Sequence, residues 1–170
     1  MTFEAGDLVV HPIRGAGVVE RVQERHWHGR NAVYYRIALL CQPGTSVMIP
    51  ASAAAEVGLR PAVSQATLRK VWRVLRGVPR KLPPDHKDRY ELLKQKLHTG
   101  DVFNVAEAVR DMAWRQMQEG HLTLKGKRIY DKAIMLLAGE AAAVDGIDLI
   151  EAEARVRTTL RENLSAVTVM

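Results

Sequence analysis

The 170-residue sequence predicts an α+β protein, in which a small antiparallel β module is followed by an all-helical domain. Two observations carry this prediction. Apolar residues alternate with a period of two in the first sixty residues, and after that they recur every three or four residues. The predicted strands follow one another through short turns with no helix between them, which favours an antiparallel sheet. We therefore expect a curved sheet or open barrel in residues 1–61 and a helical domain in residues 62–170.

Short runs of β-branched and aromatic residues, bounded by glycine and proline, define the predicted strands. They cover residues 8–10, 18–22, 33–40 and 46–49. Turn residues at His28-Gly29-Arg30-Asn31 precede the third strand, which is the strongest. In the second strand, simple alternation places Val18 and Val22 on one face and Val19 on the other.

Capping residues and apolar spacing divide the second part of the chain into five predicted helices. Each one begins after a side chain that can accept a backbone hydrogen bond, and the predicted N-caps are Ser64, Asp85, Asp101, Thr123 and Asp148. A proline-rich connector over residues 78–84 separates the first helix from the second. We expect the tail over residues 165–170 to fray.

The chain carries a net charge of +6, and the positive charge is concentrated in one region. The net charge is +1 over residues 1–63, +8 over residues 64–132 and −3 over residues 133–170. Such a basic region is either a set of solvated helix faces or the electrostatic footprint of a phosphate backbone. No zinc-finger spacing and no ribonucleoprotein motif accompanies it. DNA would therefore be held through shape and phosphates, without sequence preference.

Composition and motifs argue against several other classes of protein. No stretch reaches the roughly 18 apolar residues of a membrane span, and the chain does not open like a secretory signal, so we expect a cytoplasmic protein. The single cysteine, Cys41, excludes an intramolecular disulfide and a Cys-rich zinc site. The usual phosphate-loop, esterase and zinc-protease motifs do not occur, so we expect no enzyme and no cofactor. His26 and His28 would share one face of an extended segment, but such a pair near a turn does not predict a metal site.

The N-terminal segment carries a specific motif. Residues 3–19 have the sequence FEAGDLVVHPIRGAGVV, a Gly-Asp-x-Val-Val-x-Pro strand followed by Gly-x-Gly-Val-Val. In this motif the chain resembles the CarD/CdnL family of bacterial transcription regulators. The resemblance continues through residues 34–35, 49–50, 57–60, 82–83, 89–90, 99–101, 105–111 and 137–140. The first part alone is also similar to the polymerase-interacting domain of the transcription-repair coupling factor, a much larger ATPase that lacks the helical part.

This resemblance implies a Tudor-like N-terminal module that docks on the β subunit of bacterial RNA polymerase. The family's contact arginine on the second strand corresponds to Arg25. The family's basic residue before the Ile-Pro pair corresponds to Met48, so a basic interaction is missing there. Val47 and Trp27 complete the predicted polymerase-binding set.

The resemblance further implies that the helical domain contacts promoter DNA at the upstream edge of the melted bubble and stabilises the open complex. The family's wedge tryptophan corresponds to His86, whose imidazole offers less apolar area and stacking than an indole. Lys87, Arg89, Lys127 and Arg128 are the predicted phosphate contacts of this domain.

Several alternatives stay open at this point. His86 is either a weaker DNA contact or an exposed residue without function. The weakened wedge and the lost basic contact fit a polymerase-bound factor that has little effect or represses. The charge pattern alone also fits a sequence-nonspecific DNA-binding module that does not act through polymerase. In each case we expect a monomer.

Overall fold

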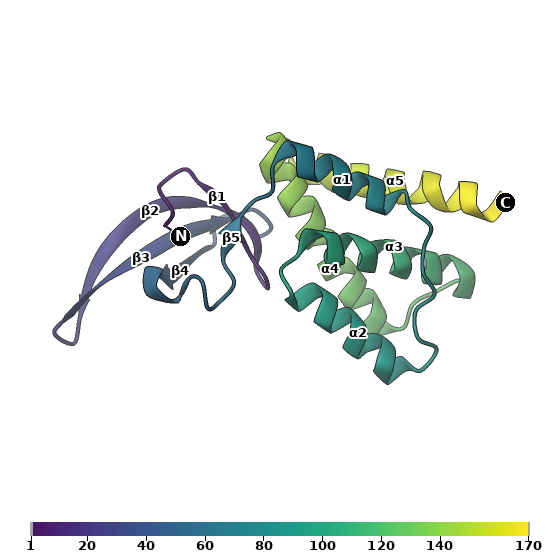
Figure 1. The fold of residues 1–170 in the computed structure, drawn as a ribbon, viewed down its shortest axis with the longest axis horizontal. Helices are drawn as coiled ribbons and strands as arrows, with labels where there is room; N and C mark the ends of the chain where they lie inside the picture. Colours follow the sequence, from purple (N-terminus) through teal and green to yellow (C-terminus); the bar gives the residue numbers. More distant parts are fainter. Residues whose placement is uncertain (1, 170) are drawn as a thin grey trace.

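Residues 2–169, which the computed structural model describes, form a five-stranded antiparallel sheet followed by five α-helices (Figure 1). The strands are β1 (Leu8–His11), β2 (Gly15–Trp27), β3 (Arg30–Leu39), β4 (Ser46–Pro50) and β5 (Arg60–Pro61). Their order in the sheet is β4-β3-β2-β1-β5, so β4 and β5 form its edges. A single 3-10 turn at Ala51–Ala53 follows β4. The predicted fold class is confirmed.

The hairpin of β2 and β3 is longer than the sequence predicted. Trp27 pairs with Arg30, so only His28 and Gly29 form the turn, with φ angles of 49° and 74°. Positive φ at both central residues is typical of the tight turns that match the twist of a hairpin. The prediction that His26 and His28 share one face of an extended segment is therefore wrong, because His28 lies in the turn.

A β-bulge at Glu20 changes the side-chain pattern of β2. Val19 pairs with Ile37, but Arg21 pairs with Arg36, so Glu20 is an extra residue on its strand. A bulge shifts the alternation by one residue. Val22, which pairs with the buried Tyr35, lies on the face of Val19 and not on that of Val18. The predicted face of Val22 is thus wrong.

The β module has its own apolar core. Its buried members are Phe3, Val9, Val19, Tyr35, Ile37, Leu39, Ile49, Ala54 and Leu59. The Phe3 ring packs edge-on against Tyr35 at a centroid distance of 5.5 Å, and the Phe3 backbone N–H donates to the Tyr35 hydroxyl at 3.2 Å. The N-terminal segment therefore belongs to the fold of the sheet.

The helices are α1 (Gln65–Leu75), α2 (His86–His98), α3 (Val102–Glu119), α4 (Leu124–Asp145) and α5 (Leu149–Val169). All five predicted caps accept a backbone N–H at the start of their helices. The predicted fraying is wrong for residues 165–169, since α5 continues to Val169, and Met170 lies outside the described residues. Leu164 is buried, and Asn163 donates to the carbonyls of Leu75 and Gly77, which anchors this part of α5.

An ion pair between the half-buried Arg60 and the buried Glu140 joins the β module to the helical domain. The Arg60 guanidinium donates to both carboxylate oxygens of Glu140 on α4 at 2.7 and 2.8 Å, and to the Gly100 carbonyl at 2.6 Å. Glu140, whose side chain is 2% exposed, also accepts the backbone N–H of Val63 at 3.0 Å. All these groups are thereby satisfied in one network, as buried charges require.

Close packing of α4 against the sheet supports this network. The Cys41 thiol donates to the Met135 carbonyl at 3.4 Å, and a Cβ at Gly139 would lie only 2.9 Å from the Cys41 sulfur. Glycine therefore allows α4 to approach the β module.

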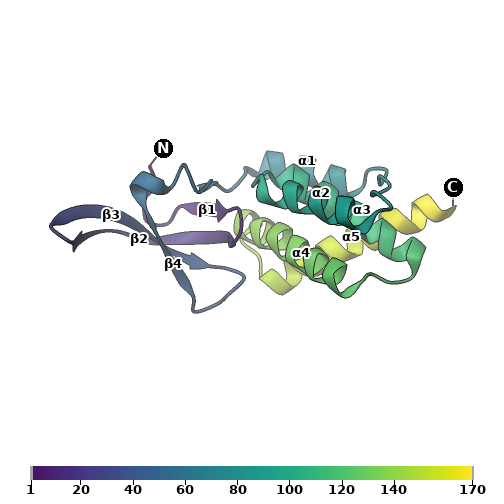
Figure 2. The same ribbon diagram turned by 90° about the horizontal axis from the view of Figure 1, so that it is seen from below.

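The sheet and the helices lie at the two ends of an elongated molecule (Figures 1 and 2). Within residues 2–169, no helix has the length and apolar character that crossing a membrane requires.

Candidate functional site

One candidate surface lies along the β2–β3 hairpin and the edge strand β4, and we call it the hairpin surface. Its members line a shared hollow and are Glu24, Arg25, His26, Trp27, Tyr34 and Met48. The hairpin brings Arg25 and Trp27 to Met48, although 20 or more residues separate them in the sequence. Trp27 is 72% exposed, and Arg25 is exposed with no ion pair to any carboxylate of residues 2–169. An unpaired guanidinium beside an exposed indole is typical of an anchor for a protein partner.

Val47 does not join the hairpin surface. It pairs with Ile37, is half-buried, and packs against the core of the β module. Since successive side chains of a strand point to opposite faces, Met48 reaches the hollow and Val47 does not. What this part of β4 offers a partner is its backbone, because β4 pairs with β3 alone and forms a sheet edge.

The second candidate surface lies where the N-terminal turns of α2 and α4 meet, and we call it the α2–α4 surface. His86, Lys87 and Lys125 line one hollow there, together with Tyr90. The His86 ring lies 6.3 Å from the Tyr90 ring, and the Lys125 ammonium lies 4.8 Å from the centre of that ring. The structure therefore brings His86 and Lys87 together with a lysine that the sequence analysis did not single out.

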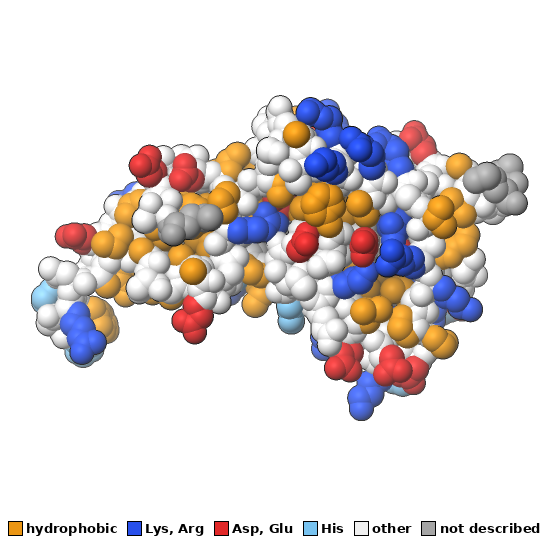
Figure 3. All heavy atoms as spheres, viewed as in Figure 1, with side chains coloured by type: hydrophobic (Ala, Val, Ile, Leu, Met, Phe, Trp, Pro, Cys, Tyr) orange, Lys and Arg blue, Asp and Glu red, His pale blue; other side chains and the backbone are white. Residues whose placement is uncertain are grey.

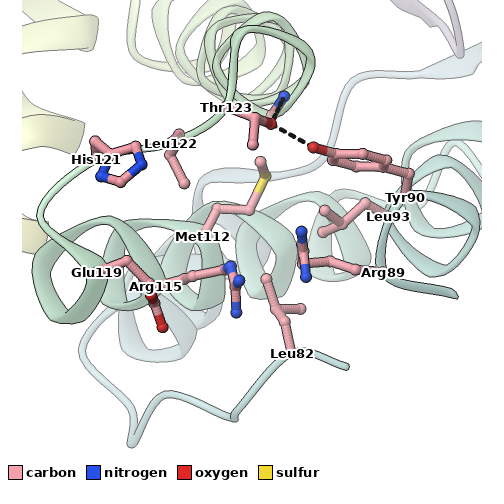
Figure 4. Close-up of a pocket in the computed structure, with 11 residues that line it drawn as sticks. Leu82, Arg89, Tyr90, Leu93, Met112, Arg115, Glu119, His121, Leu122 and Thr123 are labelled. Atoms are coloured by element: carbon pink, nitrogen blue, oxygen red, sulfur yellow. Dashed lines mark hydrogen bonds between the residues drawn. The ribbon is translucent and has the colours of Figure 1, made fainter. Parts of the chain in front are cut away.

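Hydrogen bonds hold the two helix ends in place. The Tyr90 hydroxyl bonds to the hydroxyl of Thr123, and this N-cap of α4 also accepts the backbone N–H of Gly126 at 3.1 Å (Figure 4). On α2, the backbone N–H of Asp88 donates to Asp85 at 3.0 Å, and this bond holds the pKa of the Asp85 carboxyl below its usual value. The Tyr90–Thr123 bond therefore joins α2 to the N-terminus of α4, where Lys125 stands, while the N-terminus of α2 is capped by the Asp85 carboxylate.

The structure speaks against Arg89 as a direct phosphate contact. Its side chain is only 6% exposed and donates to the carbonyls of Pro83 and Pro84 at 3.1 and 2.9 Å. Figure 4 shows it among Leu82, Leu93 and Met112, at a small internal cavity. Arg89 therefore fastens the proline-rich connector to α2.

Lys127 and Arg128 are exposed on the first two turns of α4 but do not line the hollow of the α2–α4 surface. Leu124, three and four residues before them, is 69% exposed. Residues at this spacing share a helix face, so the exposed Leu124 side chain lies beside two cations. Leu124 was not predicted as a surface residue, although its position five residues before the core-facing Ile129 indicates that it points outward.

Within residues 2–169, no group of three or more His, Cys, Asp or Glu side chains is placed to hold a metal ion. The two surfaces instead have the chemistry of macromolecular contacts. A sheet edge with an aromatic anchor suits a protein partner, and clustered lysines at helix N-termini suit phosphates. The fold thus presents two separate candidate surfaces, one at the edge of the sheet and one at the N-terminal turns of α2 and α4.

Comparisons with known proteins identify the class. Residues 3–63 match the family model described as "CarD-like/TRCF RID domain", and residues 70–157 match the model "CarD, C-terminal domain". A Bacillus subtilis (strain 168) protein named "Putative transcription factor YdeB" is 32% identical over 146 residues, which is 85% of this chain and 94% of that protein. The chain belongs to the CarD/CdnL family. It is accordingly a transcription regulator that interacts with RNA polymerase.

Proposed function

We propose that the protein docks on the polymerase β subunit through the hairpin surface, contacts promoter DNA at the upstream edge of the bubble through the α2–α4 surface, and stabilises the open complex. The observation that carries this proposal is the fixed link between the two surfaces. The Arg60–Glu140 network joins the β module to α4, and α4 in turn contributes Lys125 to the α2–α4 surface. Docking of the hairpin surface on polymerase therefore determines the position of the α2–α4 surface.

The chemistry of each end suits its proposed partner. Edge strand β4 can extend a sheet of the β subunit, while Arg25 reaches a carboxylate there. Docking raises the local concentration of DNA at the helical domain, so weak and sequence-tolerant contacts are sufficient. If those contacts favour melted over closed DNA, the protein shifts the equilibrium by the ratio of its two affinities.

The test is the lifetime of polymerase complexes on a ribosomal-type promoter, measured by competitor challenge with and without the protein. A longer lifetime is expected. An unchanged or shorter lifetime with normal polymerase binding would favour the alternative of an ineffective or repressing factor. DNA binding without binding to core polymerase would favour a nonspecific DNA-binding module.

Neutralising a single lysine tests the phosphate contacts. Lys127→Gln in the full chain is expected to weaken duplex binding about equally on unrelated sequences and to lower the salt slope by about one. Arg161→Gln, which removes an exposed charge from α5, serves as the control and is expected to leave the slope unchanged. A Lys127 variant with altered sequence preference would contradict a phosphate-only role.

His86 variants test the wedge position. His86→Trp is expected to lengthen the open-complex lifetime, because an indole buries more apolar area at a base step, and His86→Ala to shorten it slightly. Identical lifetimes for all three proteins, each at saturation, would mean that His86 does not touch DNA.

A further inference from the structure

A third surface is a groove between α1 and α5, which we call the arginine groove. Arg69, Trp72, Arg73 and Arg76 line it from α1, and Arg155 and Thr159 line it from α5. Its volume is about 750 Å³, within the range of small-molecule sites. In Figure 1, α3 lies between α1 and α2, so the groove is separate from the α2–α4 surface.

The groove has an excess of positive charge. Arg69, Arg73 and Arg76 follow one another at helical spacing, and none forms an ion pair with a carboxylate of residues 2–169. Arg155 on the opposite wall is different, since Glu151, the one carboxylate among the residues that line the groove, accepts from it at 2.9 Å. The sequence from residue 57 to residue 84 contains seven Lys and Arg and no Asp or Glu, and Figure 3 shows Lys and Arg gathered over α1.

The three arginines of α1 have no counter-charge on their own helix. Like charges at positions i and i+4 of a helix repel each other, and here no carboxylate on α1 offsets them. An anion in the groove would relieve the repulsion. Guanidinium groups also bind phosphate oxygens through paired hydrogen bonds, which makes phosphate the anion that fits them best.

The groove also offers an aromatic surface. Trp72 is half-buried, so one part of the indole packs against the helical core while the rest lines the groove. Thr159, which is 9% exposed, adds a hydroxyl on the α5 side of the groove. Ala154 on the same side has a small side chain. A ligand with a planar ring can stack on the indole while its phosphates reach the arginines.

We propose that the arginine groove binds a nucleotide with two or more phosphates, with the base against Trp72 and the phosphates on Arg69, Arg73 and Arg76. A small ligand fits better than a duplex backbone, because helices wall the groove on two sides and its aromatic surface lies between them. Phosphates of a duplex need only protruding cations, and these are already present on the α2–α4 surface. Nucleotide binding would thus be a property additional to the contacts with polymerase and promoter DNA.

The test is isothermal titration of the full-length protein with GDP, ADP, guanosine, inorganic pyrophosphate and a 20-base-pair duplex. At least one of the two nucleotides is expected to bind with a Kd below about 1 mM, and more tightly than guanosine or pyrophosphate. Arg73→Ala should weaken nucleotide binding about tenfold or more, because it removes a charge-assisted contact. Lys70→Ala is the matched control. It removes the same charge from the same helix, at an exposed residue that does not line the groove, and should leave the affinity unchanged.

A second variant tests the aromatic contact. Trp72→Phe keeps a ring in the core but reduces the stacking area, so it should weaken nucleotide binding and leave pyrophosphate binding unchanged. Four results would overturn the proposal: no binding of either nucleotide, equal affinity for nucleotide and pyrophosphate, an equal loss in Lys70→Ala, or a loss in Arg73→Ala confined to the duplex. The last result would make the groove a DNA surface instead. Thermal denaturation of each variant verifies that the exposed Arg73 and Lys70 can be changed without unfolding.

Discussion

Arg60→Gln is expected to lower the free energy of unfolding by about 3–5 kcal/mol, the largest effect on stability that we predict. The substitution leaves the Glu140 carboxylate charged and 2% exposed, without the guanidinium that now binds both of its oxygens. The Gly100 carbonyl also loses its donor. For a chain of this size, such a loss corresponds to a fall in Tm of roughly 6–20 °C. Urea and thermal denaturation measure it.

Substitution of the other partner, Glu140, provides the comparison. Glu140→Gln should cost less, because Arg60 is 26% exposed and can turn its charge toward water, while the glutamine oxygen can still accept the N–H of Val63. The double variant Arg60→Gln/Glu140→Gln removes both charges and should recover part of the loss of the single Arg60 variant. Equal costs for both single variants, or no recovery in the double variant, would contradict the view that the isolated carboxylate is the source of the instability.

Arg25→Glu is expected to abolish co-purification with RNA polymerase, the largest effect on binding that we predict. Breaking a desolvated pair at an interface costs about 2–5 kcal/mol, which is a loss of affinity of roughly 30-fold to several thousandfold. Arg25 is exposed and unpaired within residues 2–169, so its replacement should change the stability of the free protein by less than about 0.5 kcal/mol. Pull-down with core polymerase and a quantitative binding assay measure the effect.

Arg21→Glu is the matched control for this experiment. Arg21 is exposed on the same strand, β2, but does not line the hollow of the hairpin surface. The same reversal of charge there should leave polymerase binding within a few-fold of wild type. Unchanged affinity of a folded Arg25→Glu protein would show that the docking assignment is wrong. An equal loss of affinity in both variants would show that polymerase responds to the charge of the whole strand and not to Arg25.

The helical half of the fold was predictable because its signals are local. Each cap is a single side chain that binds a backbone N–H two or three residues further on, as Asp85 does with Asp88. The course of β2 was less predictable, because the bulge at Glu20 depends on its pairing with β3, where the Glu20 carboxylate forms an ion pair with Arg36 at an N–O distance of 3.0 Å. Alternation along one strand contains no information about such an extra residue.

The candidate surfaces were predictable only in part. The positions of Arg25 and His86 followed from the resemblance, and both side chains are exposed as a contact requires. Arg89 looked equally suitable, yet it turns inward to carbonyls five and six residues before it, a contact without a sequence signature. The arginine groove exists only because α5 packs beside α1, and the chain brings them together across more than seventy residues.

The Arg60–Glu140 pair has a consequence for how a promoter segment is chosen. Both residues fall in stretches that carried the family resemblance, but only the fold shows that they meet across 80 positions of sequence. Because the pair holds the β module against α4, the distance between the hairpin surface and the α2–α4 surface is set by the fold. Under the proposed function the protein acts as a rigid spacer. The base pairs it touches are then selected by their distance from the enzyme, and a promoter of any sequence presents its phosphates at that distance.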